Sequence, residues 1–83
     1  MVGIKEEGCY RRVGYTVSLI RSNVGHWTFR VDVHQRNGLV ASDTFISPGF
    51  YNTDVEAHRA AVELAELYID RQLCLLHTSD LAL

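Results

Sequence analysis

Residues 51–76, YNTDVEAHRAAVELAELYIDRQLCLL, are the stretch of this 83-residue chain that decides its fold. Thr53 is a typical helix N-cap residue, and Glu56, three residues later, completes a capping box. Asp54 places negative charge at the positive end of the helix dipole. The pattern therefore predicts one long helix from about Asp54 to about Leu75.

At about 100° per residue, this helix carries apolar residues on two sides. The first row is rich in alanine, which suits close approach to a sheet: Ala57, Ala60, Ala61, Leu64, Leu67, Tyr68 and Leu75. The second row lies almost opposite: Val55, Val62, Ile69 and Leu73. The charged residues form one narrow strip: Glu56, Arg59, Glu63, Glu66 and Asp70. A helix on a small sheet needs an apolar stripe of only about 100–140°, so the second row predicts a further contact surface.

Two kinds of cover would suit the second row. The first is the chain itself, through the N-terminal MVGI or the C-terminal LAL. The second is another molecule, most simply a second copy, because symmetric dimers are the commonest oligomers. We favour the second and treat Val55, Val62, Ile69 and Leu73 as a candidate homodimer interface.

Three segments before the helix alternate between apolar and polar residues, as strands do. In residues 13–21 the apolar face carries Val13, Tyr15, Val17 and Leu19. In residues 26–35 it carries Trp27, Phe29, Val31 and Val33. The third segment is LVASDTFIS, residues 39–47. Pro48 and Gly49 then end the sheet, because proline cannot donate to a ladder.

The dipeptide Asn37-Gly38 predicts a hairpin between the second and third of these strands. A two-residue loop sets Val33 opposite Ser42 and brings Asp32 opposite Asp43, a like-charge pair. A three-residue loop with a bulge sets Phe29 opposite Phe45 and Val33 opposite Ala41, with Asp43 toward the core. The sequence leaves this register open, with a preference for the aromatic pair of the bulged form.

These elements predict an α+β fold in the order β-β-β-α: a three-stranded antiparallel meander with the helix packed on its Trp27/Phe29 face. Residues 10–77 form the single domain of this prediction. Residues 1–9 are expected to be a flexible lead-in, and residues 78–83 a C-terminal tail.

The composition of the chain excludes some classes of function without identifying one. The chain is 47% hydrophobic and 22% charged, which is typical of a globular domain, and its net charge is −2. Residues 1–36 carry six basic groups against three acidic ones, and residues 37–83 carry two against seven. No signal-peptide core or membrane-spanning stretch is evident, so we expect a cytoplasmic protein without membrane contact, with Cys9 and Cys74 reduced.

No catalytic, metal-binding or cofactor motif occurs in the sequence. The four histidines have no recognised ligand spacing, and the glycines are scattered rather than gathered in a phosphate-binding loop. We therefore expect a non-enzymatic protein without a cofactor. The alternative is nucleic-acid binding through the open face of the sheet, where Arg12, Arg30 and His34 would contact phosphates.

Two family resemblances bear on these alternatives. YTVSLI followed by YNTDVEAHRAAVELAELYID looks like small bacterial antitoxins of the HicB type, whose helix opens on a T-x-x-EA run matched here by Thr53, Glu56 and Ala57. The three strands with NTDVEAHRAAVELA also resemble the C-terminal two-thirds of a double-stranded RNA-binding domain. The first resemblance implies an antitoxin-like or immunity-like protein-interaction role, and the second implies RNA binding.

Overall fold

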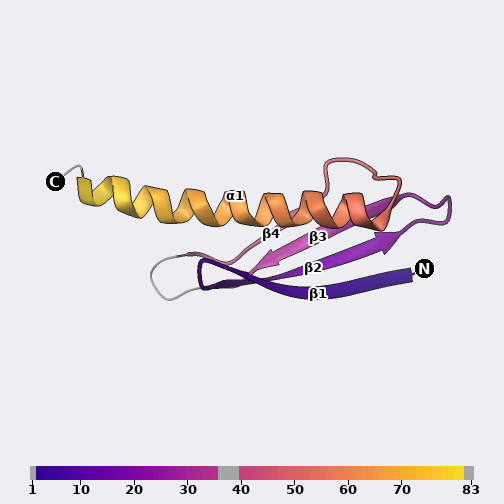
Figure 1. The fold of residues 1–83 in the computed structure, drawn as a ribbon, viewed down its shortest axis with the longest axis horizontal. Helices are drawn as coiled ribbons and strands as arrows, with labels where there is room; N and C mark the ends of the chain where they lie inside the picture. The colour runs from indigo at the N-terminus through magenta and orange to yellow at the C-terminus, as the bar shows by residue number, and fades with distance from the viewer. Residues whose placement is uncertain (1, 36–39, 82–83) are drawn as a thin grey trace.

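The computed structural model describes residues 2–35 and 40–81, with side-chain detail as far as Cys74. Its elements are β1 (Val2–Tyr10), β2 (Val13–Arg21), β3 (Trp27–Val33), β4 (Asp43–Ile46) and α1 (Asp54–Leu81). The strands form one sheet in the order β1-β2-β3-β4, and each strand runs antiparallel to its neighbour. The helix lies across one face of this sheet (Figure 1). The predicted α+β class, with an antiparallel sheet and one C-terminal helix, is confirmed.

The prediction of three strands is wrong, because β1 is a fourth strand where a flexible lead-in was expected. It pairs with β2 over its whole length, from Val2 opposite Arg21 to Tyr10 opposite Val13. The sequence of β1 does not show the apolar alternation of a strand, because an edge strand needs few core residues. Gly8 lets β1 approach closely, since a Cβ there would lie 2.5 Å from the ring of Tyr15, its cross-strand partner.

The β1–β2 turn consists of Arg11 and Arg12, both with positive φ (52° and 67°). A two-residue hairpin turn of this kind normally carries asparagine or glycine, because other residues strain in the left-handed region. The Arg-Arg dipeptide is therefore no turn signal, and the sequence pattern did not reveal this hairpin. The strained turn is tied to α1 by contacts described below.

The register of β3 and β4 differs from both predicted alternatives. Val33 lies opposite Asp43, and Val31 lies opposite Phe45. Asn37 and Gly38 lie outside the described residues. Phe45 packs edge-on against Tyr68 of the helix, with ring centroids 4.9 Å apart, and the Tyr68 hydroxyl donates to the Ala41 carbonyl at 2.9 Å. In the observed register, the segment that contains β4 therefore contacts the helix through Phe45 and Ala41.

The predicted N-cap and the helix-facing sides of the strands are confirmed. The Glu56 amide donates to Thr53 Oγ1 at 3.1 Å. The alternating residues of β2 and β3 are buried beneath the helix, with Trp27 partly buried at the rim: Val13, Tyr15, Val17, Leu19, Phe29, Val31 and Val33. Together with the helix they form the one core cluster of the described residues.

The alanine-rich row that the sequence predicted to face the sheet does so, but the buried side extends further round the helix than predicted. Four side chains spaced by four residues are completely buried: Ala57, Ala61, Ala65 and Ile69. Leu67, predicted to face the sheet, is 54% exposed, whereas Ile69 of the second row has no exposed surface. The buried side therefore includes Ala57 and Ala61 of the first row and Ile69 of the second, and other residues of both rows pack at its flanks.

The helix is also longer than predicted, since α1 continues to Leu81 instead of ending near Leu75. Its 28 residues span about 42 Å, whereas a nine-residue strand spans about 30 Å. Figure 1 shows the C-terminal part of α1 extending beyond the strands. Residues 78–81, expected in the tail, are helical, and residues 82–83 lie outside the described part.

Candidate functional site

The structure divides the row that the sequence predicted as an interface. Ile69 is a core residue, covered by the chain's own sheet. Val62 and Leu73 are half-buried and pack against the same core, and Val55 is 63% exposed. The assignment of Ile69 to an interface is therefore corrected, because Ile69 lies on the side of the helix that packs against the sheet. Only Val55 remains a fully exposed member of the row.

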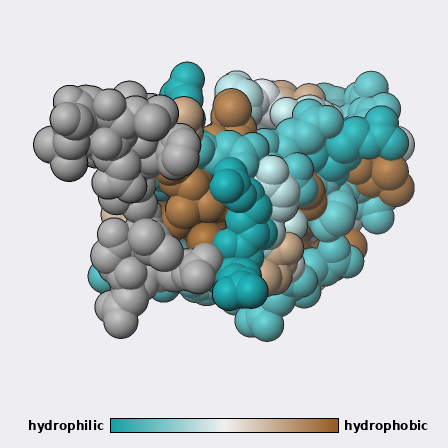
Figure 2. Space-filling view, turned by 60° about the vertical axis from the view of Figure 1, so that its left-hand side comes forward, coloured by the Kyte–Doolittle hydropathy of each residue, from teal (hydrophilic) through white to brown (hydrophobic). Residues whose placement is uncertain are grey.

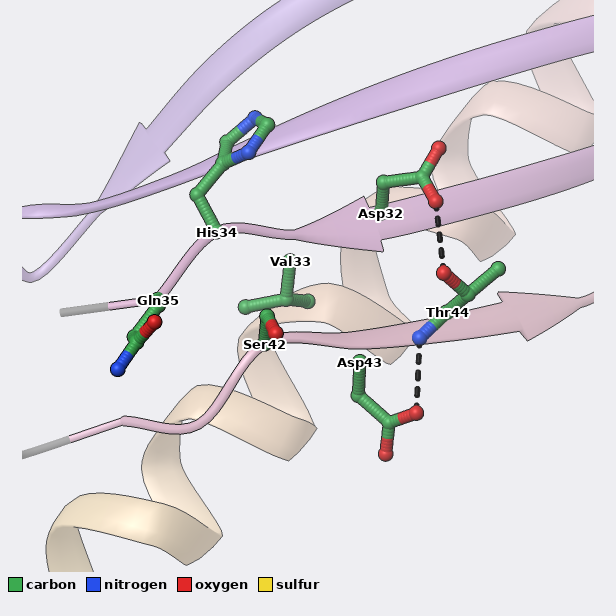
Figure 3. A pocket seen from close by; sticks show the side chains of 7 residues that line it. All are labelled: Asp32, Val33, His34, Gln35, Ser42, Asp43 and Thr44. Carbon is green, nitrogen blue, oxygen red and sulfur yellow. Dashed lines mark hydrogen bonds between the residues drawn. The ribbon is translucent and has the colours of Figure 1, made fainter.

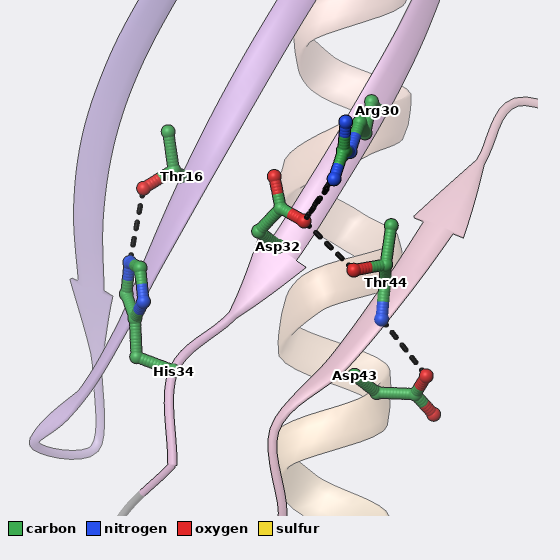
Figure 4. Close-up of polar contacts among 6 residues, drawn as sticks. All are labelled: Thr16, Arg30, Asp32, His34, Asp43 and Thr44. Atoms are coloured by element: carbon green, nitrogen blue, oxygen red, sulfur yellow. Dashed lines mark hydrogen bonds and ion pairs between the residues drawn. The ribbon is translucent and has the colours of Figure 1, made fainter.

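The residues predicted to contact nucleic acid lie in the β1–β2 turn and on the open face of the sheet. Arg12 is in the β1–β2 turn, while Arg30 and His34 are exposed on the sheet face opposite the helix. Arg30 is engaged by Asp32 at 3.3 Å, and His34 Nε2 forms a 2.9 Å hydrogen bond with Thr16 Oγ1 (Figure 4). The His34 amide also donates to the Gly14 carbonyl at 2.9 Å, two residues from Arg12 in the sequence.

The charge of this open sheet face is balanced. On its strands, Lys5 and Arg30 are matched by Glu7 and Asp32. Because affinity for the phosphate backbone depends on an excess of positive charge, this arrangement does not favour phosphate contacts. The surface instead presents a net-neutral polar layer, with hydroxyl groups between the charged residues.

A polar hollow of about 470 Å³ opens where β3 and β4 separate. It is lined by Asp32, Val33, His34, Gln35, Ser42, Asp43 and Thr44 (Figure 3). Asp32 accepts a 2.7 Å hydrogen bond from the Thr44 hydroxyl, and the Thr44 amide donates to Asp43 at 2.8 Å. Across the described residues, no group of three metal-ligand side chains is close enough to hold an ion. Asp32 thus joins β3 to β4, whereas Asp43 accepts a hydrogen bond from its own neighbour in β4.

Shallow grooves flank the helix, because one helix about 10–12 Å wide covers only about two strands of a sheet. Toward β4, a groove of about 250 Å³ is mainly apolar: Phe29, Pro48, Tyr51, Ala60, Glu63, Leu64 and Leu67. Toward β1, a groove of about 230 Å³ contains a polar contact between the helix and the edge strand, with His58 Nε2 2.8 Å from Glu6 Oε2. Glu6 and Asp43 both occupy helix-side positions on the two edge strands.

Asp70 holds the strained hairpin against the helix. Its carboxylate lies 2.8 Å from Arg11 Nη1 and accepts from the Tyr10 hydroxyl at 3.1 Å. The hydrogen bond to Asp70 is the main cause that raises the pKa of Tyr10 above its ordinary value of 10.0, with burial adding to it. The pKa values of Tyr15 and Tyr68 are raised mainly by burial. The sequence had placed Asp70 in a solvated acidic strip.

These tyrosines predict a loss of stability in alkaline solution. The unfolded chain releases its tyrosine protons at a lower pH than the folded chain, so their contribution is constant below about pH 10 and falls above it. Tyr10→Phe should lessen this alkaline fall, because the group with the hydrogen bond to Asp70 no longer titrates. The measurement is urea unfolding of both proteins at neutral and alkaline pH. If the free energies of unfolding of the two proteins differed by the same amount at every pH, Tyr10 would have no part in the alkaline loss of stability.

Exposed hydrophobic side chains gather at one end of the molecule. We call this the turn end: it holds residues 22–26, residues 47–52 and the start of α1 (Figure 1). Five large apolar residues lie on or beside it: Ile20, Val24, Ile46, Phe50 and Val55. On the face drawn in Figure 2, hydrophobic residues instead form separate patches divided by hydrophilic ones. Leu67, midway along the helix, is the other large exposed apolar side chain among the described residues.

Comparison with known proteins adds no assignment: no family model, curated protein or solved structure matches this chain. Within the described residues, no helix is both long enough and apolar enough to cross a bilayer.

Proposed function

We propose that this chain is a small non-enzymatic protein-interaction domain that works as a homodimer. The observation that carries the proposal is that α1 is longer than the sheet it packs on. The C-terminal part of α1, which ends at Leu81, extends beyond the strands (Figure 1). Because most helical stability comes from tertiary packing, a partner surface alongside this part of α1 would stabilise it.

The dimensions of the chain support the same proposal. It measures 53 × 19 × 15 Å, and its radius of gyration is 14.5 Å, whereas a compact chain of this length has about 12 Å. It exposes 5774 Å² of surface, whereas a compact monomer of this mass exposes about 5000 Å². The chain therefore exposes roughly 800 Å² more surface than a compact monomer of its mass.

The test is the mass of the native chain in solution, measured by sedimentation equilibrium across the micromolar range. We expect twice the chain mass at the upper concentrations and reversible dissociation on dilution. A single monomeric species throughout that range would overturn the proposal. If that monomer also bound oligonucleotides at low salt, and released them as salt was raised, nucleic-acid binding would replace it.

A further inference from the structure

We infer that the second copy binds along α1 in an antiparallel arrangement, with Leu67 of each copy on the two-fold axis. The inference rests on the proposed homodimer and specifies its surface. It begins from the 54% exposure of Leu67 on a helix whose opposite side is completely buried. An apolar side chain of this size gains most from burial when it meets an apolar partner.

A stripe along the helix runs through Leu67 on the flank that borders the groove toward β4, and Ala60 at its start also packs against the core. We call it the Leu67 stripe: Ala60, Glu63, Leu67, Arg71 and Cys74. At about 100° per residue these positions fall within an arc of about 80°. Their spacing of three or four residues is that of helices packed side by side. The small side chains Ala60 and Cys74, at the two ends of the stripe, allow the helix axes to approach closely.

The charges of the Leu67 stripe are complementary to themselves. Glu63 precedes Leu67 by four residues, and Arg71 follows it by four. A two-fold axis through Leu67 therefore sets Glu63 of each copy opposite Arg71 of the other. Both side chains are exposed, and in the described part of the chain neither takes part in an ion pair. Antiparallel helices also oppose their dipoles favourably.

The length of the helix agrees with this register. Leu67 lies at the middle of α1, which runs from Asp54 to Leu81. Antiparallel pairing about Leu67 thus sets the helical end beyond the sheet, residues 74–81, beside the helical start of the other copy. Each copy would cover the part of α1 that its own sheet does not reach.

Pairing through the sheet edges is a less favourable route to a dimer. Each edge strand carries a carboxylate on its helix side, Glu6 on β1 and Asp43 on β4. Charged side chains that point inward on an edge strand oppose the addition of another strand. The turn end is apolar, but its exposed residues show no charge pattern that selects a second copy. The Leu67 stripe has both an exposed apolar centre and matched charges.

Disulfide trapping tests the register directly. In a Cys9→Ser, Cys74→Ser background, Leu67→Cys places one thiol of each copy beside the two-fold axis, so mild oxidation should link nearly all of the protein as a dimer. The matched control is Cys74→Ser alone, which keeps the exposed Cys9 on the open sheet face and should remain unlinked. A second control, Arg59→Cys in the same background, places the thiol on another side of the helix and should link far less.

Charge reversal provides an independent measurement. Glu63→Arg sets two like charges together at each end of the interface and should weaken dimerisation about tenfold, as should Arg71→Glu. The double variant restores both pairs in reversed order and should return the dissociation constant to near the native value. A residue important only for folding would not show this recovery. Raising the salt concentration should reduce the difference between the variants.

These experiments distinguish failure of the Leu67 pairing from failure of the homodimer itself. A native dimer that fails to link through Leu67→Cys and ignores both charge reversals would overturn the Leu67 pairing and leave the homodimer standing. If Val24→Ser and Phe50→Ser then dissociated that dimer, its interface would be the turn end. A native chain that stays monomeric would overturn both.

Discussion

Ile69→Asp is expected to leave the chain unfolded at room temperature. Ile69 has no exposed surface and packs in the centre of the contact between helix and sheet. A domain of this size is stable by about 4–12 kcal/mol. Leaving an unpaired charge in a core costs several kcal/mol, and loss of the isoleucine side chain alone costs about 2–5 kcal/mol. Together these penalties approach or exceed the whole stability of the domain.

Circular dichroism and urea unfolding measure this result. The matched control is Leu67→Asp, which introduces the same residue two positions earlier, where the side chain is 54% exposed. That variant should keep a cooperative unfolding transition, and through the inferred pairing it should also lose dimerisation. If Ile69→Asp folded and only dimerisation were lost, Ile69 would belong to an intermolecular interface, as the sequence pattern first suggested.

Ala61→Leu is expected to destabilise the domain by about 1–3 kcal/mol, although leucine is nearly as good a helix former as alanine. Ala61 is completely buried against the sheet, midway along the stripe of Ala57, Ala61, Ala65 and Ile69. Three added carbon atoms would force the helix away from β2 and β3. The loss of contact would extend to the neighbouring core residues, because a helix moves as a rigid unit.

The measurement is the urea midpoint at constant slope, which reports stability without a change in the extent of unfolding. Arg59→Leu is the control for helix propensity, because Arg59 is exposed and two residues away on the same helix. It should change stability by less than about 0.5 kcal/mol. Equal effects at the two positions would show that close packing at Ala61 contributes little.

The fold class could be predicted from the sequence because a helix start and a half-buried strand each depend on residues that are close together in the chain. The capping box predicted where α1 begins, and the alternation of β2 and β3 predicted which side chains meet the helix. β1 escaped prediction because its partnership with β2 depends on backbone hydrogen bonds and on Gly8 beneath Tyr15, neither of which requires an apolar pattern. The turn of Arg11 and Arg12 also contains no asparagine or glycine that would have predicted a hairpin.

The surface of the helix shows the same division. The order of residues is enough to show that α1 is apolar around most of its circumference and that its charges form one strip. The part of that arc that the sheet covers depends on tertiary packing, which buries Ile69 and leaves Leu67 exposed. The physical reason is that periodicity defines the angles between side chains but not the rotation of the helix about its axis. That rotation depends on how the sheet, including β1, packs against all of them at once.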